Sequence, residues 1–183
     1  MNNGNTEGPK APARSAAVHG FAPVANVDAE VLILGTMPGP RSLTRAEYYA
    51  HPQNAFWRII GEILGFDASV PYADRLQALK SARVGLWDVL RTCVREGASD
   101  SNIDEVGLVP NGFSEFFARH KEIRLVTFNG AKAESLYRRH VLPQLDLEGM
   151  RYLRLPSTSA AHASTSFEHK LRAWREVMQP ADA

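Results

Sequence analysis

The feature that most limits the possible folds is the alternation of short apolar runs with segments of helical periodicity. The first run, Val31–Leu34, is closed by Gly35 and is too short for a helix, so it predicts a buried strand. Further strands are predicted at 83–88, 123–128 and 152–155, and helices at 54–64, 73–81, 114–120, 130–140 and 167–178. Four such alternations are typical of a parallel sheet with helices on both faces. We therefore expect an α/β fold: a three-layer α/β/α sandwich around a mostly parallel, four-stranded sheet.

Length and composition indicate a single domain. The chain has 183 residues, of which 44% are hydrophobic, which is enough for one core. Its one cysteine, Cys93, excludes an internal disulfide framework and a four-cysteine zinc site. The net charge of +1 neither requires nor forbids a polyanionic partner. Since no stretch approaches about 20 apolar residues and no secretory signal opens the chain, we expect no membrane contact and a cytoplasmic location.

The first twenty residues differ from the rest of the chain. They are rich in Asn, Gly, Pro, Ala and Ser and have no apolar periodicity, so residues 1–20 are predicted to be a flexible tail. The folded domain is then expected over residues 21–183. Lys10 and Arg14 could contact a nucleic acid, but a solvated tail without a specific role is the favoured interpretation.

The carboxyl ends of the predicted strands indicate where a ligand binds, because in open α/β sheets the ligand lies beyond these ends. Four loops follow them: Gly35–Gly39, the segment beginning at Asp88, Asn129–Gly130 and Pro156–Ser159. The first loop lacks the spacing and lysine of a phosphate-binding loop and the spacing of a dinucleotide fingerprint. Hydrolysis of nucleoside triphosphates is therefore excluded.

The segment 48–57 combines aromatic rings with side-chain hydrogen-bond donors. Aromatic faces stack on nucleic-acid bases, and an asparagine such as Asn54 can hold a water molecule or contact a base edge. Two simpler interpretations stay open. Phe56 and Trp57 are better explained as core residues, and Asn54 also suits the N-terminal cap of the following helix.

Taken in order, the first loop, the segment 49–57, Phe128–Gly130 and Leu155–Ser159 resemble the uracil-DNA glycosylase superfamily. The chain is most similar to the hypoxanthine-DNA glycosylase branch, followed by the mismatch-specific uracil glycosylases, and the resemblance extends over about Val31 to Met178. It implies a monofunctional enzyme that flips a damaged nucleotide out of DNA and cleaves its glycosidic bond with water.

The resemblance also assigns roles to the first loop and to the aromatic segment. The loop formed by Gly35, Thr36, Met37, Pro38 and Gly39 would contact the deoxyribose. Met37 stands where most of the superfamily has a catalytic Asp or Asn, and the thioether side chain of methionine can neither activate nor orient a water molecule. The hypoxanthine branch implies that Asn54 has this catalytic role instead. Tyr49 matches the aromatic residue that stacks on the flipped base, although a partly buried structural tyrosine is the alternative.

Two further residues are candidates for reading the base. Asp88 matches a strand-end position where uracil-specific relatives have Asn. An ionised carboxylate accepts hydrogen bonds, which suits the N1–H of hypoxanthine, although Asp88 could equally cap the next turn. Asn129 offers a donor and an acceptor at the same cleft.

The loop after the last strand resembles the segment that contacts the DNA backbone in relatives. The predicted DNA contacts are Ser157, Thr158, Ser159 and His162, together with Ser42, which lies three residues after the first loop. Leu155 replaces the catalytic histidine of the uracil enzymes. His162 is a candidate to stabilise the leaving base, with an ordinary surface histidine as the alternative.

The sequence thus predicts a DNA glycosylase that excises hypoxanthine, present as deoxyinosine, in base excision repair. The expected partner is DNA, the expected state is a monomer, and no cofactor is implied. No metal is predicted, because His51 and His162 lack a third ligand at suitable spacing. Two alternatives stay open: a glycosylase for uracil or G:T/U mismatches, and a catalytically silent DNA-binding module, since Met37 and Leu155 replace residues that drive uracil excision.

Overall fold

A computed structural model describes residues 17–95, 97, 103–162 and 165–178 of the chain. Its centre is a four-stranded sheet with the order β3-β2-β6-β7, in which every neighbouring pair is parallel. The strands are β2 (Val31–Gly35), β3 (Val84–Asp88), β6 (Leu125–Asn129) and β7 (Arg151–Leu155). The predicted sheet and its strands are confirmed, with bounds that differ by one or two residues.

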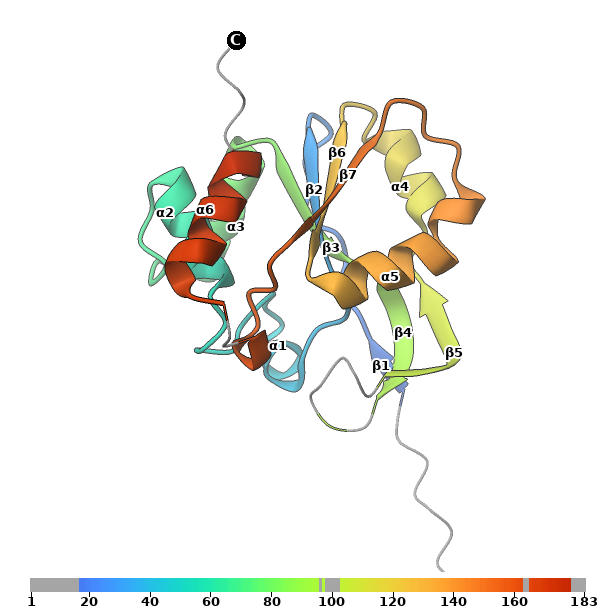
Figure 1. Cartoon of the computed structure of the whole chain (residues 1–183), viewed down its shortest axis with the longest axis horizontal. Coiled ribbons are helices and arrows are strands. Elements are labelled where there is room, and N and C mark those ends of the chain that lie inside the picture. Colours follow the sequence, from blue (N-terminus) through green and yellow to red (C-terminus); the bar gives the residue numbers. More distant parts are fainter. Residues whose placement is uncertain (1–16, 96, 98–102, 163–164, 179–183) are drawn as a thin grey trace, which may run out of the picture.

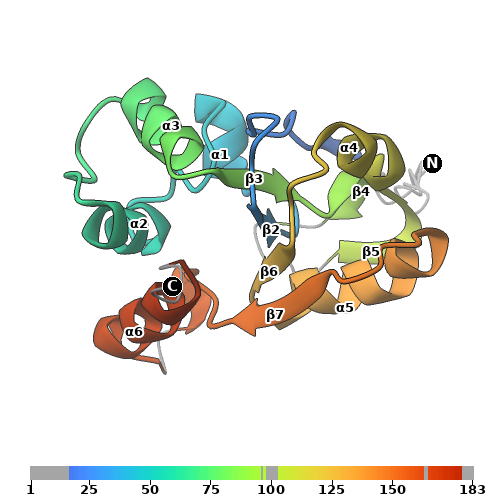
Figure 2. The ribbon, with the colours of Figure 1, turned by 90° about the horizontal axis from the view of Figure 1, so that it is seen from above.

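Helices cover both faces of this sheet (Figures 1 and 2). One layer holds α2 (Phe56–Leu64), α3 (Tyr72–Ser81) and α6 (Phe167–Met178), and the other holds α4 (Phe113–Arg119) and α5 (Ala131–His140). Side chains of β2 alternate between the two layers, since Leu32 and Leu34 pack with α4 and α5 whereas Ile33 packs with α2, α3 and α6. This confirms the three-layer sandwich and explains the uninterrupted apolar run, because both faces of β2 are buried.

A second sheet was not predicted. It is antiparallel, has the order β1-β4-β5, and consists of β1 (Ala17–His19), β4 (Leu90–Arg95) and β5 (Ile103–Pro110). In Figure 1 it lies beside the carboxyl ends of the central strands. Only Val89 separates β3 from β4, so the chain passes directly from one sheet into the other.

The second sheet also changes the boundary of the predicted tail. Ala17–His19 pair with Thr92–Val94 of β4, so these residues belong to the folded domain and not to the tail. A strand of three residues is too short to show a periodicity, so the sequence alone does not separate residues 17–19 from the predicted tail. Residues 1–16 lie outside the described part of the chain.

Two smaller elements flank the central sheet. The short helix α1 (Pro40–Arg45) follows the first strand-end loop, and a 3-10 helix (Ala160–His162) follows the loop after β7. In Figure 1 both lie at the same end of the sheet. In the described residues, no helix is long and apolar enough to cross a membrane.

Candidate functional site

The parallel register brings the four predicted loops to one edge of the central sheet. Gly35 at the end of β2 is the partner of Asp88 at the end of β3, and Asn129 at the end of β6 is the partner of Leu155 at the end of β7. The predicted site residues on these loops therefore lie along one edge, as expected for parallel strands of similar length.

The space beside the Cα of Gly35 is tightly filled. A Cβ atom added there would lie 2.3 Å from Oδ1 of Asp88 and 2.8 Å from the hydroxyl oxygen of Tyr49. The carboxylate and the hydroxyl thus both lie against the Cα of Gly35, in space that any other residue would fill. The structure therefore brings together the predicted base-reading carboxylate and the predicted stacking tyrosine.

Asp88 is deeply buried, with a relative exposure of 3%. Its negative charge acts on the neighbouring Tyr48: burial, and after it the Asp88 carboxylate, raise the pKa of the Tyr48 hydroxyl. The backbone carbonyl of Asp88 accepts a hydrogen bond of 2.8 Å from Nδ2 of Asn111, which fixes the end of β3. The strand end therefore combines a backbone held by a side-chain hydrogen bond with a buried carboxylate.

Tyr49 has an unusual backbone. Its φ of 53° lies in the left-handed region, which bulky side chains rarely adopt. Its half-buried ring stacks on Phe56, with the ring centroids 4.1 Å apart and the planes inclined by 27°. The local chain is thus shaped to place this ring between the core of the α2 layer and the sheet edge.

Asn54 lies just before α2. Its Oδ1 accepts a hydrogen bond of 3.0 Å from the backbone N–H of Phe56, the first residue of that helix. The cap residue of α2 is Ala55, so this bond supports the capping interpretation only in part: it binds the first helical N–H from one residue before the cap. It also fixes the half-buried amide in one orientation. A carbonyl oxygen has two lone pairs, so this bond does not exclude a second contact.

The first loop presents fewer side chains than predicted. Met37 is 6% exposed and packs in the hydrophobic core, and Thr36 is equally buried. The carbonyl of Pro38 accepts a hydrogen bond of 2.9 Å from Nη2 of Arg95, a buried residue of β4. Any contact of Met37 with a substrate must therefore come from its backbone, and the second sheet holds this loop in place.

Asn129 is bound to the loop after β7. Its Nδ2 donates to Oγ1 of Thr158, and its Oδ1 accepts from the backbone N–H of Thr158, both at 2.8 Å. Thr158 itself is 1% exposed. These two predicted ligand-binding residues thus join the ends of β6 and β7, and the side chain of Thr158 does not reach the surface.

Three more contacts fix the same loop. The carbonyl of Thr158 accepts a hydrogen bond of 2.9 Å from the N–H of Ala55, Trp174 Nε1 donates to the carbonyl of Pro156 at 3.0 Å, and Lys170 Nζ donates to the carbonyl of Ser159 at 3.5 Å. Lys170 is buried, and burial lowers the pKa of its amine.

The remaining predicted DNA contacts differ in accessibility. Ser157 and Ser159 are half-buried, and each hydroxyl oxygen accepts a backbone N–H two residues later. His162 is exposed at the end of its 3-10 helix. Ser42 is buried, and its Oγ accepts the N–H of Ala50 at 3.2 Å. The structure therefore makes Ser42 an internal support of the Tyr49 segment.

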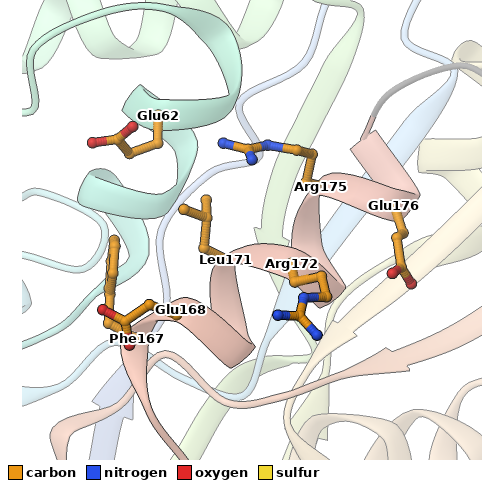
Figure 3. A pocket seen from close by; sticks show the side chains of 7 residues that line it. All are labelled: Glu62, Phe167, Glu168, Leu171, Arg172, Arg175 and Glu176. Carbon is orange, nitrogen blue, oxygen red and sulfur yellow. The ribbon is translucent and has the colours of Figure 1, made fainter.

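A groove lies elsewhere, between α2 and α6. Figure 3 shows the residues that line it: Glu62 comes from α2, and the others, Arg175 among them, come from α6. None of the strand-end residues lines it. Over the described ranges, no cluster of three or more His, Cys, Asp or Glu side chains could hold a metal ion.

Sequence reasoning missed Arg95, Lys170 and Trp174, all of which hold strand-end loops through backbone carbonyls. For two of them a signal existed. Lys170 and Trp174 are four residues apart on the predicted last helix and therefore share one face. A lysine on the apolar face of a helix is unusual, and this could have indicated a buried role. Arg95 had no such signal, because its strand was not predicted.

The comparisons with known proteins agree with this architecture. Residues 22–178 match the model of the Uracil DNA glycosylase superfamily, and the chain belongs to that superfamily. The predicted resemblance is thereby confirmed.

Two curated relatives are similar to this chain, and both are named hypoxanthine DNA glycosylase. The protein from Methanosarcina acetivorans is 35% identical over 161 residues, covering 87% of this chain and 97% of the relative. The protein from Methanosarcina barkeri is 44% identical over 115 residues, which cover 62% of this chain and 72% of the relative. A solution NMR structure of a candidate uracil DNA glycosylase from Methanosarcina acetivorans has a TM-score of 0.74 and 34% identity, over 89% of this chain and 97% of the other.

Proposed function

We propose that this protein is a DNA glycosylase that removes hypoxanthine from DNA containing deoxyinosine. One structural observation carries the proposal: the carboxylate of Asp88 and the hydroxyl of Tyr49 both lie against Gly35 at the sheet edge. An acceptor and an aromatic ring at one point are what a flipped purine needs for hydrogen bonding and stacking. The two similar hypoxanthine DNA glycosylases support the same substrate.

Base recognition follows from the chemistry of these two side chains. One face of the Tyr49 ring is covered by Phe56, so the opposite face is assigned to the base. A carboxylate oxygen of Asp88 accepts from the N1–H of hypoxanthine. Asn129 is a weaker candidate for reading the base, since both ends of its amide already bind Thr158.

Bond cleavage is assigned to water held by Asn54. The base leaves with the electron pair of the glycosidic bond, and water adds to the sugar carbon C1′. The proton that this water loses balances the proton that the departing base gains at its freed nitrogen. An amide is a weak base, so its contribution is to position the water as positive charge develops on the sugar. The hydrogen bond to the N–H of Phe56 keeps the amide in one orientation for this role.

The DNA backbone is assigned to the loop after β7. Ser157, Ser159 and exposed His162 supply donors for phosphate oxygens, and the contacts of Asn129 and Lys170 hold this loop in place. A single chain contributes all four strand-end loops, so we propose that the enzyme acts as a monomer. Its expected location is the cytoplasm, at the nucleoid.

The test is a panel of duplexes containing deoxyinosine, deoxyuridine or deoxyxanthosine, or a G:T mismatch. Base release under single-turnover conditions is followed by alkaline cleavage of the abasic strand. The proposal requires release from the deoxyinosine duplex to be fastest. Fastest release from the uracil or mismatch duplex would instead identify the protein as a glycosylase for uracil or for G:T/U mismatches. No release from any duplex would indicate a DNA-binding module.

Two substitutions separate the catalytic role of Asn54 from helix capping. Asn54→Ala removes both, whereas Asn54→Ser keeps a good N-cap but shortens the side chain and removes the amide. If Asn54 positions water, both variants lose base release and keep DNA binding. Asn26→Ala, at an exposed position, is the control. Release by Asn54→Ser at the rate of the unsubstituted protein would reduce Asn54 to a helix cap.

A further inference from the structure

The segment carrying Tyr49 is held by three side chains, of which only Trp57 lies within the motifs described above. Both backbone polar groups of Tyr48, the residue before it, are bound by aromatic side chains. The N–H of Tyr48 donates to the hydroxyl oxygen of Tyr72 on α3 at 2.9 Å, and the carbonyl of Tyr48 accepts from Nε1 of Trp57 on α2 at 2.8 Å. Two helices thus fix the peptide groups on both sides of Tyr48, and the second of these leads into Tyr49.

The residue after Tyr49 is fixed as well. The N–H of Ala50 donates to Oγ of Ser42 on α1 at 3.2 Å. Three side chains from three helices therefore bind the backbone on both sides of the one residue in this segment that combines a large ring with a left-handed φ. A strained backbone persists only where its surroundings impose it, and such strain is concentrated at functional sites.

The two aromatic side chains are in turn held by Arg75 of α3. Its guanidinium carbon lies 4.9 Å from the ring centroid of Trp57 and 5.2 Å from that of Tyr72. The same guanidinium pairs with Glu47 at 3.6 Å. The two hydrogen-bonding rings meet edge to face, with centroids 5.8 Å apart. The positions of the Tyr72 hydroxyl and of Trp57 Nε1 are therefore fixed by the cation–π contacts with Arg75 and by the contact between the two rings.

We propose that Ser42, Trp57 and Tyr72 are positioning residues that hold the Tyr49 ring in the orientation needed to stack on the flipped base. The inference rests on the proposed function, because it gives these residues a role through Tyr49. None of the three contacts the base. They act on the backbone of Tyr48 and Ala50, and so determine where the ring of Tyr49 lies.

The sharpest test is Tyr72→Phe, which removes one hydroxyl and keeps the ring that Arg75 and Trp57 contact. We expect single-turnover release of hypoxanthine to slow about tenfold, as for one lost hydrogen bond with a buried donor left without a partner. Binding to undamaged duplex should not change. Trp57→Phe, which removes the Nε1 donor, should slow release to a similar extent.

A matched control is Tyr137→Phe on α5. It also removes a buried tyrosine hydroxyl, but in the core cluster on the other face of the sheet. Release should be unchanged in Tyr137→Phe, and urea unfolding of both variants measures how much stability each one loses. If Tyr137→Phe slows release as much as Tyr72→Phe does, the effect is one of general stability and the inference is wrong.

A double-mutant cycle with Tyr49→Ala completes the test. If Tyr72 acts through the Tyr49 ring, Tyr72→Phe should cause no further slowing once that ring is absent. Equal slowing in both backgrounds would overturn the inference while the proposed function stands. Rapid release by a folded Tyr72→Phe protein would do the same. Absence of hypoxanthine release by the unsubstituted protein would instead refute the proposed function, and this inference with it.

Discussion

Substituting Gly35 by alanine tests the arrangement of the site with a single added carbon. The new Cβ would lie 2.3 Å from Oδ1 of Asp88 and 2.8 Å from the hydroxyl oxygen of Tyr49. Ordinary contacts begin near 3.4 Å, so the carboxylate must move by more than about 1 Å. Both crowded atoms are the ends of side chains, which can rotate, and they belong to the two side chains assigned to the base.

The expected loss follows from this displacement. A misplacement of about 1 Å in a catalytic arrangement slows a reaction by about 100-fold, so Gly35→Ala should slow hypoxanthine release by about that factor. The fold should change much less. Alanine in a strand is favoured over glycine by roughly 0.5–1 kcal/mol, which opposes the strain of the new contact. Activity should therefore fall far more than the free energy of unfolding.

The assay is single-turnover release from a deoxyinosine duplex, with urea unfolding as the measure of stability. Gly112→Ala is the control, because a Cβ there would meet nothing within 4 Å. Release by a folded Gly35→Ala protein at the rate of the control would show that Asp88 and Tyr49 can move apart without consequence. The proposed recognition of the base by these two residues would then be refuted.

Four further predictions concern neighbouring side chains. Tyr49→Phe should keep most of the release rate whereas Tyr49→Ala should lose about 1–3 kcal/mol of stacking, and equal damage by both would assign the role to the hydroxyl. Asp88→Asn should lower hypoxanthine release relative to uracil release, so an unchanged ratio in a folded protein would remove Asp88 from base recognition. Asn129→Ala should lower the free energy of unfolding by about 1–3 kcal/mol, because Thr158 loses two partners, and a change near zero in urea unfolding would contradict this. Burial lowers the pKa of Lys170 below its usual 10.5, so the unfolded chain binds more protons and stability should rise with pH toward 10.5; Lys170→Met should remove that rise in unfolding experiments at pH 7 and pH 10.

Most of the central sheet could be predicted because three of its strands, β2, β3 and β6, are buried on both faces, whereas β7 is largely exposed. Val31–Leu34 has no polar residue to break the apolar run, and this pattern requires layers on either side. The candidate loops could be predicted because ligands of open α/β sheets bind beyond the carboxyl ends of the strands. Asp88 and Asn129 lie at such ends, so they could be selected without knowledge of their contacts. The same rule could not show that the amide of Asn129 is bound to Thr158, since that depends on the distance between two loops 29 residues apart.

The second sheet could not be predicted, for a different reason. Its strand β4 alternates only in part, and its last buried position is Arg95, a charged residue that sequence patterns assign to the surface. Its burial depends on a carbonyl acceptor at Pro38, which is remote in sequence. Likewise, nothing in Met37 itself indicated that its side chain turns into the core rather than toward a ligand.

The central position of β2 has a consequence for how the enzyme becomes active as it folds. This strand pairs with β3 about 50 residues later and with β6 about 90 residues later, and β6 must then accept β7. Contacts so distant along the chain form slowly, and long-range parallel pairing is the slowest kind. A chain still being synthesised can therefore join Gly35 to Asp88 well before the loop of Thr158 exists. Glycosylase activity should return during refolding only with the last strand, so that partly folded molecules leave DNA intact.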